Sequence, residues 1–192
     1  MKTEVNKMMP ISLDQLEASA TYMADRSFRR YGNVLPTLII INPEAVFLMS
    51  APVKTPMHQE EFVENCKLAC IAKGATMTLF VSRAWIRVCG GQPTAPKEPA
   101  NKPCGTECLL LVGETHGSLT RKELAIFRAS DGAFSGFGEP VTIESVVVKS
   151  NISEFMPVEP PTPAMRSSAE MLLRQRKVHI QEFVPQVSNV WN

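Results

Sequence analysis

Two stretches in the first half of the chain repeat apolar residues every three to four positions, the spacing of one face of an α-helix. The first stretch, 12–31, begins with Ser12 and Gln15 at the spacing of a capping box, in which each side chain bonds to the other residue's backbone. The second, 56–73, follows Thr55, whose hydroxyl can cap a first helical turn. Both stretches are followed by glycine, a common helix end. We therefore predict helices over these two ranges.

Shorter apolar stretches bounded by turn residues predict strands. The range 38–41 has no polar alternation, which is typical of a strand covered on both faces. The glycine-rich range 132–138 is interpreted as a flexible return. The predicted strands are 34–42, 44–51, 76–88, 107–114, 119–129 and 141–150. Because most connections suit hairpins, we predict an α+β fold: a mainly antiparallel sheet of five to six strands with two helices packed on it, plus a C-terminal helical and extended arm.

Four prolines between residues 157 and 163 mark a stiff linker between a core and an arm. We predict a loose N-terminal arm at 1–10, a core domain at 11–156, and a C-terminal arm at 157–192 that contains a helix at 164–177. Such an arm cannot bury its apolar residues alone, so it must return to its own domain or dock on another subunit. We favour a homodimer. The residues assigned to self-association are Met171, Leu172, Ile180, Phe183, Val184 and Trp191.

Composition narrows the classes of function. The chain has 192 residues, of which 44% are hydrophobic and 20% charged, with a formal net charge of +1. Its apolar runs are far shorter than the roughly 20 residues that span a bilayer, so we expect no membrane association. The near-zero charge does not favour nucleic acid as a partner, although it leaves that class open. The first residues lack the apolar segment of a signal peptide, so we expect a cytoplasmic protein with reduced cysteines.

Three cysteines and a histidine gather around the proline-rich range 90–103, and they are the candidates for metal or thiol chemistry. Cys89, Cys104, Cys108 and His116 are ligand types that zinc accepts, but a zinc knuckle normally has two short cysteine pairs and this region has one. Ordinary thiols are the favoured interpretation, with a zinc site, a Cys89–Cys104 disulfide or a Cys104–His116 dyad as alternatives. We therefore expect no cofactor.

Arg83, Trp85 and Arg87 alternate along one predicted strand, so they share a face of the sheet if its pairing is regular. Such a face could bind a phosphate backbone or a carboxylate-rich partner, with the indole stacking on a base or a guanidinium group. The favoured alternative is a self-contained stack that covers the sheet surface, or a β-bulge that shifts the alternation after Val81. These three residues are our candidates for binding a ligand or partner.

The ranges 80–85 and 107–114, on either side of the proline-rich loop, resemble a pattern seen in uncharacterised bacterial proteins. The resemblance covers about a third of the chain and implies a small cytosolic protein of bacterial type, with no activity to transfer. We interpret the sequence as a binding or assembly module that self-associates through its C-terminal arm, with no catalytic activity inferred. The alternatives are a thiol- or metal-dependent enzyme near Cys104 and His116, and a nucleic-acid-associated factor that uses Arg83, Trp85 and Arg87.

Overall fold

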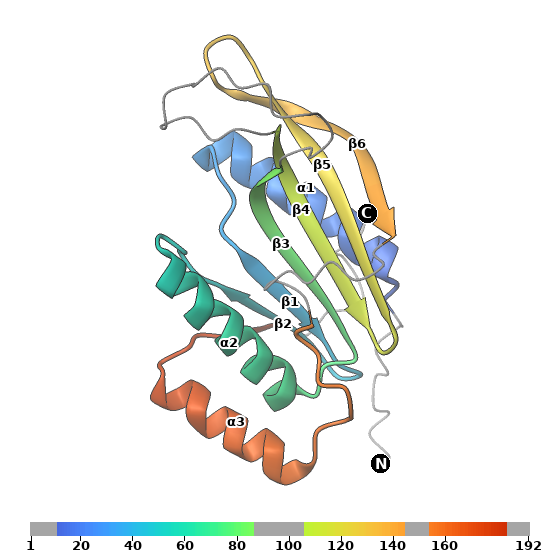
Figure 1. Cartoon of the computed structure of the whole chain (residues 1–192), viewed down its shortest axis with the longest axis vertical. Coiled ribbons are helices and arrows are strands. Elements are labelled where there is room, and N and C mark those ends of the chain that lie inside the picture. The colour runs from blue at the N-terminus through green and yellow to red at the C-terminus, as the bar shows by residue number, and fades with distance from the viewer. Residues whose placement is uncertain (1–10, 87–105, 145–153, 184–192) are drawn as a thin grey trace, which may run out of the picture.

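The computed structural model describes residues 11–86, 106–144 and 154–183, which form three helices and a seven-stranded sheet (Figure 1). The sheet has the order β6-β5-β4-β3-β1-β2-β7, and every neighbouring pair is antiparallel. The elements are α1 (Leu13–Tyr31), β1 (Thr37–Ile41), β2 (Val46–Ser50), α2 (Pro56–Lys73), β3 (Met77–Ile86), β4 (Thr106–Thr115), β5 (Ser118–Arg128), β6 (Phe134–Glu144), α3 (Pro163–Gln175) and β7 (Gln181–Phe183). The predicted α+β class and antiparallel sheet are confirmed.

The first two helices begin and end where their caps predict. The Ser12 hydroxyl accepts from the Gln15 backbone N–H at 3.2 Å, and the Gln15 side chain accepts from the Ser12 N–H at 3.0 Å, so the capping box is complete. Thr55 caps α2 by accepting from the His58 N–H. Gly32 and Gly74 end these helices in the left-handed conformation, which glycine adopts without steric cost.

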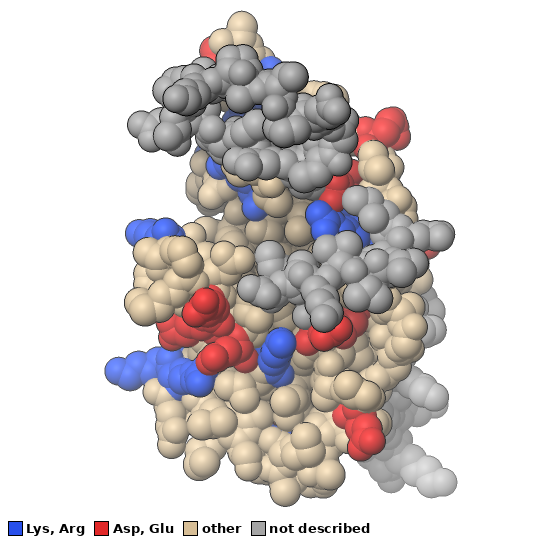
Figure 2. Space-filling view, in the orientation of Figure 1, with Lys and Arg blue, Asp and Glu red and all other residues tan. Residues whose placement is uncertain are grey.

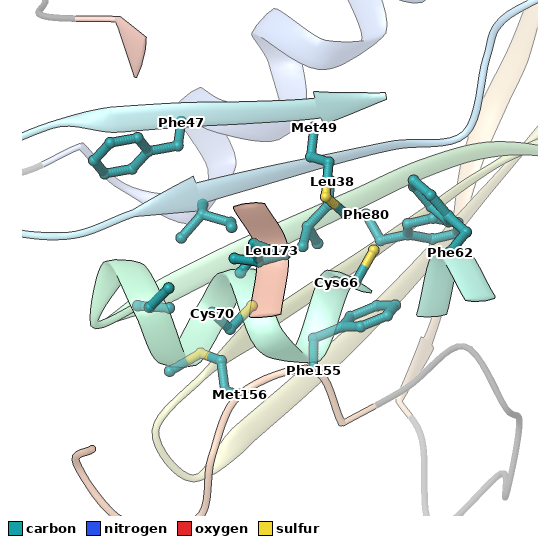
Figure 3. Packing of buried hydrophobic residues seen from close by; sticks show 14 of the residues in the cluster. Leu38, Phe47, Met49, Phe62, Cys66, Cys70, Phe80, Phe155, Met156 and Leu173 are labelled. Atoms are coloured by element: carbon teal, nitrogen blue, oxygen red, sulfur yellow. The ribbon is translucent and has the colours of Figure 1, made fainter. Parts of the chain in front are cut away.

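The helices lie on opposite faces of the sheet (Figure 1), with α1 on one face and α2 with α3 on the other. β1 separates two buried clusters: Leu38 and Ile40 point toward α2, whereas Ile39 and Ile41 point toward α1. This confirms the strand covered on both faces that the sequence predicts. Figure 3 shows the cluster on the α2 side, where Phe80 and Phe155 pack with their ring centroids 5.6 Å apart.

The sheet has seven strands, whereas the sequence predicts five to six, and the differences lie in its two edge strands, β6 and β7. The last predicted core strand, 141–150, is β6 at Phe134–Glu144, and residues 145–150 lie outside the described residues. β6 includes the glycine-rich range because Phe134 and Phe137 pack on Phe28 of α1, at centroid distances of 5.1 and 5.8 Å. Register shifts in the β5–β6 pair accommodate the irregular sequence.

The C-terminal arm supplies both the third helix and the seventh strand. α3 packs on α2, and its Ala169 and Leu173 are buried in the same cluster as Phe155. The segment before α3 is fixed at Glu114, whose carboxylate accepts the Phe155 N–H at 2.9 Å. β7 then pairs with β2 at the sheet edge. Across the described ranges, none of the helices combines the length and the hydrophobicity needed to cross a membrane.

Candidate functional site

The two described residues of the predicted Arg–Trp–Arg face do share one side of β3. Arg83 and Trp85 follow Val81 on the side of the sheet that α1 covers, whereas Ala84 packs toward the α2 side. The Arg83 guanidinium carbon lies 5.7 Å from the centre of the Trp85 ring, and the indole is 45% exposed. Arg87 lies outside the described residues.

Glu107 joins this face from the neighbouring strand and changes its electrostatics. It lies opposite Trp85 in the β3–β4 register, is buried, and approaches the Arg83 Nε to 2.6 Å. Arg128 of β5 donates to both Glu107 carboxylate oxygens, at 2.8 and 2.7 Å. The hydrogen bond from Arg128, together with the charges of both arginines, lowers the pKa of Glu107. Two guanidinium groups thus share one carboxylate, so this part of the face is largely the self-contained stack that the sequence favoured.

Glu107 and Arg128 are not among the site residues that the sequence predicts, because their place in the stack depends on the strand register. The alternation of polar and apolar residues identifies which residues of one strand share a face, but not which residue lies opposite on the next strand. The residues of the long connection between β3 and β4 give no simple turn rule for that register.

A solvent-exposed groove of about 610 Å³ lies on the same face, between α1 and strands β1, β2 and β3. Ile39, Leu48 and Val81 line it from the sheet, and Met23 and Tyr31 line it from α1. None of the described residues that line it carries a charged side chain. Arg83 follows Val81 by two residues on this face, but neither Arg83 nor Trp85 lines the groove. Met23 and Ser27 belong to the helical spacing that predicts α1, but that spacing does not show that they border a groove.

The described candidates for metal and thiol chemistry do not come together. Cys108 is buried near the start of β4, and His116 follows the end of that strand, so roughly 25 Å of extended chain separates them. This distance prevents the two residues from binding one ion. Burial raises the pKa of the Cys108 thiol to about 11. Among the described residues no group of three potential ligands is placed to hold a metal. Cys89 and Cys104 lie outside the described residues.

The predicted self-association residues divide into three groups. Ile180 packs at the margin of the α2-side cluster, whereas Met171, Leu172 and Phe183 have exposed side chains. Val184 and Trp191 lie outside the described residues.

The arm is also joined to α2 by polar contacts. Arg176 donates to Glu64 at 3.1 Å and to Asn65 at 3.0 Å, and Lys73 lies 3.4 Å from Glu170. Acidic and basic side chains lie intermixed on the face of the molecule that carries these helices (Figure 2). The helical part of the arm is therefore attached to its own domain by both apolar and polar contacts.

No protein-family model, curated protein or solved structure matches this chain.

Proposed function

We propose that this chain is a cytoplasmic binding or assembly module that forms a homodimer through its C-terminal arm. The observation that carries the proposal is the position of Phe183. Phe183 ends the described part of the arm, lies on an edge strand, and is 43% exposed although it is a large apolar residue. Exposed apolar side chains at a sheet edge favour association with another polypeptide.

The direction of the Phe183 side chain supports the use of the α1 side of the molecule. Phe183 pairs with Val46 of β2, and directly paired residues of antiparallel strands lie on the same face of a sheet. Val46 packs at the margin of the α1-side cluster. The arm therefore crosses from the α2 side, where Leu173 is buried, to an edge from which Phe183 faces the α1 side.

The oligomeric state of the full chain tests this proposal. Light scattering over a range of protein concentrations should give twice the mass of the chain, and Phe183→Lys should shift the equilibrium toward the monomer. Met57→Lys is the matched control, because Met57 is an exposed apolar residue on α2, outside the arm. A monomeric mass at every concentration would overturn the proposal.

A second candidate is recognition of an acidic partner at the Arg83–Trp85 stack, and the exposed indole favours it. Arg83, Arg128 and Glu107 together leave one net positive charge beside an aromatic ring, and such rings often anchor interfaces. Binding of a fluorescent single-stranded DNA and of an acidic peptide should both weaken in Trp85→Ala if this surface is used. Unchanged affinity for both probes would dismiss the candidate.

A further inference from the structure

We infer that the groove between α1 and strands β1, β2 and β3 is the receptor site for residues 184–192 of a second copy of this chain. This inference rests on the proposed self-association and names the surface through which it occurs. Each copy would insert its C-terminal segment into the groove of the other, so that the same contact forms twice around a twofold axis.

The charge content of the chain favours this segment over the other parts that lie outside the described residues. The groove lining carries no charged side chain. The segments 1–10, 87–105 and 145–153 each contain at least one lysine, whereas 184–192 contains no charged side chain. It does contain Val184, Val187, Val190 and Trp191, which are apolar. Burying a charge in an uncharged groove is costly, so the uncharged segment is the best match.

Three hydroxyl groups of the groove lining already have partners within the domain. The Ser27 hydroxyl donates to the Asn33 carbonyl at 2.7 Å, and the hydroxyls of Thr37 and Ser50 lie 2.8 Å apart. A polar ligand would have to compete with these internal hydrogen bonds for the three hydroxyls. An apolar segment instead gains by covering the exposed side chains at the groove margin, such as Met23 and Tyr31.

The position and direction of β7 favour a second copy. Gln181 lies opposite Leu48, which lines the groove, and Phe183 lies opposite Val46, one step farther along the same face. The chain therefore leaves β7 heading away from the groove end formed by Thr37 and Ser50. Residues 184–192 can extend about 30 Å, which is enough to reach a neighbouring molecule. To enter the groove of its own copy, the chain would have to reverse its direction after β7.

Truncation after Phe183 separates this inference from the proposed function, because it removes none of the described elements. Light scattering should show a dimer for the full chain and a monomer for the truncated chain, with unchanged unfolding temperatures at low protein concentration. A truncated chain that still forms the dimer would overturn the inference and leave the proposed self-association intact. A full chain that is monomeric would overturn both.

Fluorescence tests the groove itself, because Trp85 and Trp191 are the two tryptophans of the chain. In Trp85→Phe, Trp191 should emit at shorter wavelength in the dimer and shift to longer wavelength on dilution. Adding Met23→Glu at the groove margin should raise the dimer dissociation constant at least about tenfold, as loss of a central contact does. Met57→Glu is the control on the opposite side. Equal effects of the two glutamates, or a shielded Trp191 in a monomer, would overturn the assignment to a second copy's groove.

Discussion

The two faces of the sheet are covered to different extents, and strand β2 shows the difference within five residues. Phe47 and Met49 point toward α2 and are buried, whereas Val46 and Leu48 point toward α1 and are half-buried. Within residues 11–86, 106–144 and 154–183, the α2 face carries two helices and the segment with Phe155, whereas the α1 face carries one helix. Strand β2 therefore has one buried face, toward α2, and one face toward α1 that still exposes apolar surface.

The position of α1 explains why its face is incompletely covered. Phe28, near the end of α1, packs on Phe134 and Phe137 of β6, at the opposite edge of the sheet from β2. Leu48 of β2 lines the groove together with Met23 and Tyr31 of α1. On the other face the arm completes the cover, since Leu173 of α3 and Phe155 enter one cluster. We therefore propose that the α2 face serves stability and that the α1 face serves association.

The largest expected effect is a loss of stability on substitution of a buried residue of the α2 face. Phe155→Ala should lower the free energy of unfolding by about 3–5 kcal/mol, because it removes a fully buried ring and leaves a cavity. Chemical denaturation measures this change. Leu35→Ala, at an exposed position on the groove side, should change stability by less than about 1 kcal/mol in the truncated monomer. Equal losses for the two variants would contradict the difference between the faces.

Neighbouring residues of β2 give a closer comparison. In the chain truncated after Phe183, Met49→Ala should cost about 2–5 kcal/mol of unfolding free energy, whereas Leu48→Ala should cost clearly less because its side chain is half-exposed. In the full chain, Leu48→Ala should in addition weaken the dimer. A larger loss for Leu48 than for Met49 in the truncated chain would reverse our assignment of the faces.

The contribution of the Glu107 carboxylate to stability should depend on pH. Glu107→Gln should lower the free energy of unfolding at neutral pH by about 1–3 kcal/mol, because Arg83 and Arg128 lose a shared carboxylate. The folded-state pKa of Glu107 is lowered, so its contribution is present above the unfolded value and is lost as the pH falls through the folded value. The difference between wild type and variant should therefore shrink on acidification. A difference that stays constant between pH 7 and pH 3 would refute this origin.

The smallest expected effect is on the rate at which the buried thiols of the α2 face are modified. Burial raises the pKa values of Cys66, Cys70 and Cys108, which lie on the α2 side. In a Cys89→Ser/Cys104→Ser background these three thiols should react with a disulfide reagent only slowly at pH 7, and rapidly once the chain is unfolded. Fast reaction of the folded variant would mean that the α2 face opens readily.

The parts of the fold that local rules govern could be predicted from the sequence. The Ser12–Gln15 capping box, the strand with Leu38 and Ile39 covered on opposite faces, and the alternation of Arg83 with Ala84 all depend on residues close in the chain. The third helix was also predicted in the arm, at 164–177 against the observed Pro163–Gln175.

The features that sequence reasoning missed depend on contacts between distant segments. Glu107 meets Arg83 through the β3–β4 register, and β6 includes a glycine-rich stretch because its phenylalanines pack on Phe28. The groove lies between α1 and strands β1, β2 and β3, a tertiary feature that the periodicity of any single element does not contain.

The most direct test of the account places one copy's C-terminal segment against the other copy's groove. One sample of protein carries a spin label on Asn192→Cys, in the Cys89→Ser/Cys104→Ser background, and has no isotope label. It is mixed with a second sample that is isotope-labelled and has no spin label. Our account predicts that the amide signals of Met23, Tyr31 and Leu48 in the isotope-labelled copy broaden in the mixed dimer. Unchanged signals for these residues in a mixture shown to contain the mixed dimer would contradict it.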